Sequence, residues 1–290
     1  MKGVFTVLAT GVLLNSLPAS AAPFIFSTGD PDGRMATASR PSSTGKIEIE
    51  SADDFIVSSQ TTITNATFTG ILVGETSSPV SAADVGNVGV EIYRVFPKDS
   101  TNPPSGNVPT RVNSPANVAF LADSSPSFTT NVLNFTFTAS NSVLNGINLS
   151  PNQTTAGEGP VTGQEVRFDL TFNTPFMLSA DHYFFVPQVE VNGGEFYWLS
   201  APKPIVAPGT PFAPDLQSWI RNENLAPDWL RVGTDIVGGS PAPTFNAAFS
   251  LTGEMTGEGT GGTVPEPGSL ALLAAGLAGL GFARRRVSKQ

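Results

Sequence analysis

The chain has no cysteine and a single histidine, His182, among its 290 residues. Without cysteine it has no disulfide, no thiol nucleophile and no thiolate metal ligand. One imidazole also excludes a metal site built from several histidines. The fold must therefore be stabilised by buried apolar side chains and by backbone hydrogen bonds between strands.

Charged residues are scarce as well, at 13% of the chain against 40% hydrophobic residues. A disordered chain combines high charge with low hydrophobicity, so this composition predicts a folded body. Acidic residues outnumber basic ones by 24 to 15, and such a surface repels a phosphate backbone, so we expect no nucleic-acid partner. The 25 prolines and 29 glycines suit many turns between short strands.

The first 21 residues have the three parts of a secretory signal peptide. Lys2 supplies a positive charge, residues 4–14 are mostly apolar, and Ala19, Ser20 and Ala21 give the small-x-small pattern that a signal peptidase recognises. We predict a cut after Ala21. The apolar run is too short to cross a hydrocarbon layer of ~30 Å. A buried amino-terminal helix is the alternative interpretation.

The other end of the chain also has three parts. Residues 253–263 are rich in glycine, threonine and glutamate and predict a linker. The linker is followed by Val264, Pro265, Glu266 and Pro267, then by the uncharged residues 270–283, and then by Arg284, Arg285 and Arg286. An apolar helix followed by arginines is typical of a stop-transfer element with its basic end in the cytoplasm. At 1.5 Å per residue this helix would be only about 21 Å long, which is short for a permanent anchor.

Together, these parts of residues 264–290 resemble the PEP-CTERM sorting signal of Gram-negative bacteria. The resemblance implies that a membrane-embedded exosortase cleaves near Pro265, after the helix has held the chain transiently in the inner membrane. It also implies a final place at the cell surface or in an exopolysaccharide matrix. The prolines would keep the cleavable stretch extended. A plain single-pass anchor is the alternative.

Between the two ends, residues 22–252 show the alternation of half-buried strands. In one window Val166, Phe168, Leu170 and Phe172 would face the core, opposite Arg167, Asp169, Thr171 and Asn173. In another window the core-facing set would be Leu133, Phe135 and Phe137. Further predicted strands are residues 47–50, 55–57, 62–72, 88–96, 183–189, 196–199 and 245–252. Helical periodicity is confined to residues 215–230, where one or two turns are predicted.

This pattern predicts an all-β fold, an antiparallel β-sandwich of jelly-roll type, with 20 phenylalanines available for a dry core between two sheets. The body is similar to the uncharacterised β-sandwich domains that precede PEP-CTERM tails. The similarity lies in residues 51–55, Ser-Ala-Asp-Asp-Phe, and in the strand at 62–71. It implies no known activity.

Candidate chemistry in the body is weak. His182 precedes a predicted strand, and no G-x-S-x-G elbow accompanies it, so we predict a structural role. A glycosidase needs two carboxylates across the sugar, and the candidates are Glu165, Asp169, Glu190 and Glu195. Calcium prefers clustered oxygen ligands, which Asp30 and Asp32 or Asp53 and Asp54 would offer, but we favour Asx turns as the explanation of these residues. We predict no catalytic, cofactor or metal site.

Trp219 and Trp229 bracket a loop-like stretch and would form a sugar-stacking platform if they were exposed. Packing in the core is the alternative, and we favour it. The leading hypothesis is therefore an exported, non-enzymatic surface or matrix protein. A carbohydrate-binding module for extracellular polysaccharide is the second hypothesis, and an envelope glycoside hydrolase is the third.

Overall fold

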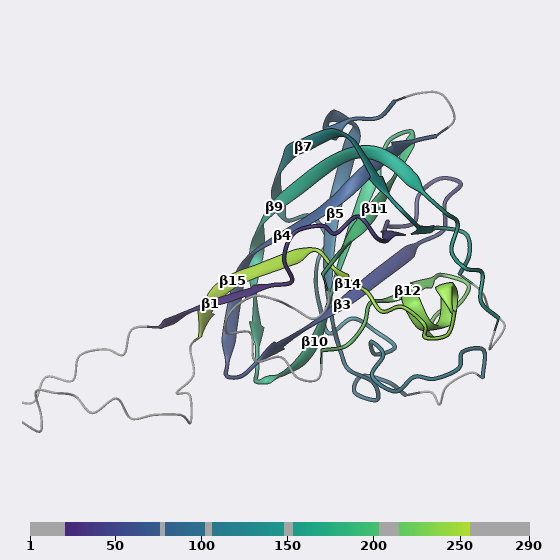
Figure 1. Cartoon of the computed structure of the whole chain (residues 1–290). Coiled ribbons are helices and arrows are strands. Elements are labelled where there is room, and N and C mark those ends of the chain that lie inside the picture. The colour runs from purple at the N-terminus through teal and green to yellow at the C-terminus, as the bar shows by residue number, and fades with distance from the viewer. Residues whose placement is uncertain (1–20, 76–78, 102–105, 148–152, 203–214, 256–290) are drawn as a thin grey trace, which may run out of the picture. The chain divides into compact units, whose positions relative to one another are not determined.

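The computed structural model describes residues 21–75, 79–101, 106–147, 153–202 and 215–255. All of them belong to the first of the two units into which the chain divides, residues 1–256. Their fold is almost entirely β, in two sheets of nine and six strands, shown in Figure 1. The helical elements described are a 3-10 turn, η1 (Ala82–Asp84), and a π-helix, η2 (Val232–Val237).

The nine-stranded sheet is built around β4, which pairs with three other long strands. In order, its main path is β1 (Ala22–Ser27), β15 (Phe249–Met255), β4 (Thr61–Gly74), β11 (Gly194–Ala201), β2 (Ala36–Ala38) and β8 (Ser142–Val143). Off this path, β9 (Val161–Leu178) pairs with β4, β7 (Ser127–Ala139) with β9, and β14 (Asn246–Ala247) with β11. All these pairs are antiparallel except β2 and β8, which are parallel, so the predicted antiparallel arrangement holds with one exception.

The six-stranded sheet contains no parallel pair among its described strands. Its order is β13 (Leu230–Arg231), β12 (Trp219–Asn222), β3 (Ile49–Val57), β10 (Asp181–Val191), β5 (Val85–Arg94) and β6 (Leu121–Asp123). The two short strands predicted at 47–50 and 55–57 are one strand, β3, because the polar residues between them are buried and hydrogen-bonded in the sheet.

Residues 215–230 are a correction to the sequence analysis. The helical period suggested by Leu216, Trp219 and Ile220 does not form a helix. Instead β12 pairs with β3, with Trp219 opposite Ala52 and Ile220 opposite Ser51. Pairing with a neighbouring strand outweighs a weak local periodicity, since the strand gains both ladder hydrogen bonds and burial.

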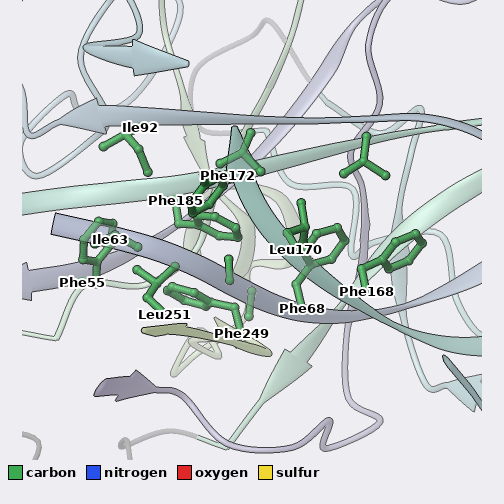
Figure 2. Close-up of a cluster of buried hydrophobic side chains, with 14 of the residues drawn as sticks. Phe55, Ile63, Phe68, Ile92, Phe168, Leu170, Phe172, Phe185, Phe249 and Leu251 are labelled. Carbon is green, nitrogen blue, oxygen red and sulfur yellow. The ribbon is translucent and has the colours of Figure 1, made fainter. Parts of the chain in front are cut away.

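The main core is a cluster of apolar side chains from both sheets in which phenylalanine is prominent (Figure 2). The Phe68 and Phe168 rings of the nine-stranded sheet stack with centroids 4.7 Å apart. Across the layers, Phe249 of the same sheet stacks on Phe185 of the six-stranded sheet at 5.1 Å. Side chains of the two sheets thus share one cluster, which is how two packed layers bury their apolar faces.

The predicted alternation is confirmed on β9 but not on β7. The predicted core-facing residues of β9, Val166, Phe168, Leu170 and Phe172, are buried, and Arg167, Thr171 and Asn173 between or beside them are exposed. On β7, Leu133 and Phe135 are 51% and 81% exposed. Alternation of apolar and polar residues shows that the two faces of a strand differ, but not that either face is covered. At the sheet margin where β7 lies, the described residues leave both side chains at its centre exposed.

Candidate functional site

Two adjacent carboxylates, Asp53 and Asp54, lie in the middle of β3 and point to opposite faces, as successive strand residues must. Asp53 accepts hydrogen bonds from the Ser218 hydroxyl at 3.0 Å and from the Ala247 backbone N–H at 2.8 Å. Ala247 belongs to β14, so this carboxylate joins the two sheets. Burial raises the pKa of Asp53 well above its ordinary value, and the charge of Asp54 adds to the increase.

Asp54 faces the other side, towards His182 and residues 215–218. One of its oxygens accepts from the Leu216 N–H at 3.0 Å, and the other lies 2.6 Å from His182 Nε2. Burial raises the pKa of Asp54, although the hydrogen bond to His182 opposes the increase. In the described part of the chain, no serine hydroxyl is bonded to this imidazole, so the contact is an Asp–His pair without a nucleophile beside it.

The outer face of the six-stranded sheet carries a buried polar network, which we call the cap network: Glu50, Tyr93, Glu91 and Arg221. Arg221 Nη2 donates to Glu50 Oε1 at 3.0 Å and to the Tyr93 hydroxyl at 2.9 Å. The Tyr93 hydroxyl also lies 2.6 Å from Glu50 and 2.7 Å from Glu91. The guanidinium covers the Trp229 ring at 4.3 Å, so this charge is both paired and stacked.

Glu91 is the member of the cap network whose pKa is raised to near neutral pH. Burial raises the pKa of its carboxyl to about 7, with further increase from the charge of Glu50 and also of Glu48, while the hydrogen bond from Tyr93 works against it. The group therefore changes charge near neutral pH, next to the ion pair of Glu50 and Arg221.

A second ion pair, Arg111 with Asp228, fastens the loops that cover this face. Nη1 of Arg111 lies 2.8 Å from Asp228 Oδ1, and both side chains are 1% exposed. Arg111 also donates to the Pro115 carbonyl and the Ser114 hydroxyl, each at 2.9 Å. A desolvated pair of this kind requires that all its hydrogen-bonding groups be satisfied.

These contacts settle where Trp219 and Trp229 lie. They are 2% and 0% exposed and pack in one cluster with Tyr93, Phe184 and Val186. The Trp229 N–H donates to the Ala116 carbonyl at 3.2 Å. The exposed platform proposed from the sequence is not formed, because the segment carrying both indoles folds down onto the sheet and presents no ring face to a ligand.

A polar hollow of about 350 Å³ lies beside the turn between β10 and β11. Its charged side chains pair with one another: Arg40 lies 2.6 Å from Glu195, and Lys46 lies 3.0 Å from Glu195 and 2.5 Å from Glu75. Glu190 also lines the hollow. A ligand would have to displace these ion pairs, since each of the two cations is already neutralised by a carboxylate.

The four carboxylates considered for sugar hydrolysis do not line one site. Glu190 and Glu195 share the hollow, whereas Glu165 and Asp169 are on β9 and do not line it. Asp169 pairs with Arg167 at 3.0 Å. Glu165 is buried rather than solvated, and burial, with the nearby charge of Asp30, raises its pKa.

The acidic turn near the amino terminus is an Asx turn. Asp32 Oδ1 accepts from the backbone N–H of Arg34 at 3.0 Å, and the Ser200 hydroxyl donates to the same oxygen. Across the described residues, no group of three or more histidine, aspartate or glutamate side chains is placed to hold a metal ion.

The predicted processing residues fall largely beyond what the structure describes. Ala19, the linker from residue 256 onward and the whole of residues 264–290 lie outside the described ranges. Ala21 immediately precedes β1, and β15 continues through Met255, so Gly253–Met255 is strand rather than linker. No helix within the described ranges has the length and hydropathy needed to cross a membrane.

The geometry of the body does not indicate a function, but one segment of the chain matches a family model. It is the PEP-CTERM protein-sorting motif, and it matches residues 263–286. The chain carries a PEP-CTERM sorting motif at its carboxy terminus. The match contains every predicted signal residue, from Val264 through the prolines to Arg286, and ends before the last four residues of the predicted tail, 264–290.

The PEP-CTERM motif implies an exported protein that exosortase processes and sorts to the cell surface. Comparisons with curated proteins and with solved structures found no match. The β-rich body therefore has no named family, and the motif is the part of the chain that a known family describes.

Several structural residues were missed by the sequence analysis, namely Glu50, Tyr93, Arg111, Arg221 and Asp228. One signal was present: Arg221 follows Trp219 and Ile220 in a chain with few charges. A charged residue in an apolar stretch predicts a buried partner, because an unpaired charge is rarely buried.

Proposed function

We propose that this protein is a non-enzymatic component of the cell surface or the exopolysaccharide matrix. A signal peptidase cuts after Ala21, and exosortase cuts near Pro265. The PEP-CTERM motif at residues 263–286 carries the proposal. The fold is compatible with both cuts, since β1 begins at Ala22 and β15 ends at Met255, so every described strand is retained.

The body then serves as a rigid module, and we propose that its two sheets form a jelly-roll-like sandwich. Its buried acidic groups support a structural role, because Asp53 and Asp54 accept hydrogen bonds from the surrounding chain and Glu50 pairs with Arg221. The carbohydrate-binding hypothesis loses the residues on which it rested, Trp219 and Trp229, because both are buried.

The test is the intact mass of the protein recovered from the cell surface. We expect a chain that begins at Ala22 and ends near Pro265. Replacing the three residues Pro265, Glu266 and Pro267 together by alanine should leave the carboxy terminus uncut and the protein in the membrane fraction. Thr260→Ala, in the preceding linker, is the matched control and should be processed normally.

Two results would count against sorting by this signal. One is surface material from the wild-type chain that still ends at Gln290. The other is unchanged processing of the triple alanine variant. The non-enzymatic part is tested separately, by incubating the processed protein with polysaccharides of its own cell surface. Turnover that is abolished by Glu165→Gln or Glu195→Gln would replace it with a hydrolase.

A further inference from the structure

The strand β7 forms one margin of the nine-stranded sheet, and it is longer than the other margin strands. It is 13 residues long and, among the described strands, pairs only with β9. The opposite margin, β1, has 6 residues and contains Pro23. The margins of the other sheet, β6 and β13, have 3 and 2 residues. Short strands, proline and β-bulges all protect sheet edges, and β7 has neither of the first two, although its register with β9 shifts twice between Val132 and Phe137.

The sequence of β7 also lacks the charges that normally protect such an edge. It reads SFTTNVLNFTFTA, without a lysine, arginine, aspartate or glutamate. At its centre Val132, Leu133 and Phe135 are 40%, 51% and 81% exposed. Its pairing with β9 is regular from Ser127 to Val132, and register shifts follow. Among the described strands this edge is therefore paired on one side only, and it carries exposed apolar side chains at its centre; Figure 1 shows β7 beside β9.

The distribution of charge indicates which partner could pair with the edge of β7. The chain as a whole is acidic, with a formal net charge of −9, so two copies repel wherever charged surfaces meet. The uncharged β7 is a long stretch that can approach its own copy without that penalty. The charged residues of β9 opposite this strand are Arg167 and Asp169, which pair with each other at 3.0 Å, and Glu165, which is buried opposite Asn134. A two-fold axis makes such a surface complementary to itself, since the same strand runs antiparallel to its mate.

We propose that β7 pairs antiparallel with β7 of a second copy of this chain, with the two-fold axis near Leu133. The pairing joins two nine-stranded sheets edge to edge and covers Leu133 and Phe135. Threonine and asparagine on the same strand would form cross-strand hydrogen-bonding pairs. The inference concerns the folded body and does not depend on how the tail is processed.

The first test is the oligomeric state of the full chain in detergent, measured by sedimentation over a range of concentrations. Wild type should form a dimer, and Leu133→Lys should raise its dissociation constant at least ~10-fold. Ile25→Lys is the matched control: it adds the same charge at a 72% exposed position on β1, the other edge, and should leave the dimer unchanged. Because every variant keeps the tail, association through the tail would survive Leu133→Lys, and that result would overturn the proposal.

The second test maps the axis and does not require a charged substitution to be tolerated. Since the chain has no cysteine, a single introduced thiol reports on one position only. Leu133→Cys should give a disulfide-linked dimer on mild oxidation, because residues facing each other across antiparallel strands have Cβ atoms about 4.5–5.5 Å apart. Ile25→Cys should remain monomeric on a denaturing gel. A monomeric wild type, or equal cross-linking at both positions, would refute the edge pairing.

Discussion

The two faces of the six-stranded sheet are stabilised in different ways. The inner face packs phenylalanines against the nine-stranded sheet and includes one buried carboxylate, Asp53, which accepts a hydrogen bond from β14. The outer face is covered by loops that two buried ion pairs, Arg111–Asp228 and Glu50–Arg221, hold over tryptophans. The buried ion pairs thus lie where a loop, rather than a second sheet, covers the apolar surface.

Successive residues of β3 therefore contribute to opposite faces of the sheet. Phe55 faces the inner cluster, while Glu50 and Ala52 face the outer one. Apolar burial does not depend on pH, whereas a network containing a carboxyl with a raised pKa does. Apolar substitutions in the main cluster and polar substitutions at the outer face should therefore differ in their effect and in their dependence on pH, and three experiments test that difference.

The largest effect is expected in the main cluster, in the part that the nine-stranded sheet contributes opposite the inner face. Phe168→Ala should lower the free energy of unfolding by about 4 kcal/mol, because it empties a site packed by Phe68 and Phe196 and leaves a cavity. Urea unfolding at pH 5 and at pH 8 should give the same loss. Met177→Ala, at a 62% exposed position of the same strand, should change stability by less than about 0.5 kcal/mol. A loss at Phe168 below 1 kcal/mol would contradict the packing described.

A somewhat smaller loss is expected from breaking a buried ion pair of the outer face. Asp228→Ala should cost about 3 kcal/mol, since it leaves the Arg111 guanidinium buried without its counter-charge. Replacing both partners, as Arg111→Met with Asp228→Leu, should cost much less than the sum of the single changes. Lys98→Ala, which breaks the half-exposed pair with Asp181, should cost less than about 1 kcal/mol and is the surface control. Additivity of the two buried changes would show that the pair is not coupled.

The smallest effect is a pH dependence at Glu91. Its folded pKa of about 7 lies above the ordinary value of 4.5, so the folded state holds the proton more tightly. The stabilisation is complete below pH 4.5 and is lost as the pH rises through 7. Between pH 5 and pH 8, wild type should lose on the order of 2 kcal/mol more than Glu91→Gln does, as measured by urea unfolding. If the free energy of unfolding changed equally with pH in the two proteins, Glu91 would not be the source of the pH dependence.

The sequence predicted elements whose cause is local. Strand β9 was recognised because its apolar and polar residues alternate for a long stretch, and the sorting motif because its parts are contiguous. The cap network was not predictable in that way, since Glu50 and Arg221 are 171 residues apart and meet only through the pairing of β3 with β12. The exposure of Phe135 was missed for a related reason: alternation assigns side chains to two faces but does not say which face is covered.

The antiparallel pairing of β1 with β15 places Ala22 opposite Met255, so the described body begins and ends at the same rung of one sheet. A force that pulls these two residues apart would break that pair first and then each following pair of β1 and β15 in turn. Both strands carry part of the main core, with Phe26 on β1 in contact with Phe249 on β15. Force applied at the two ends of the body would therefore open this core from one margin, pair by pair.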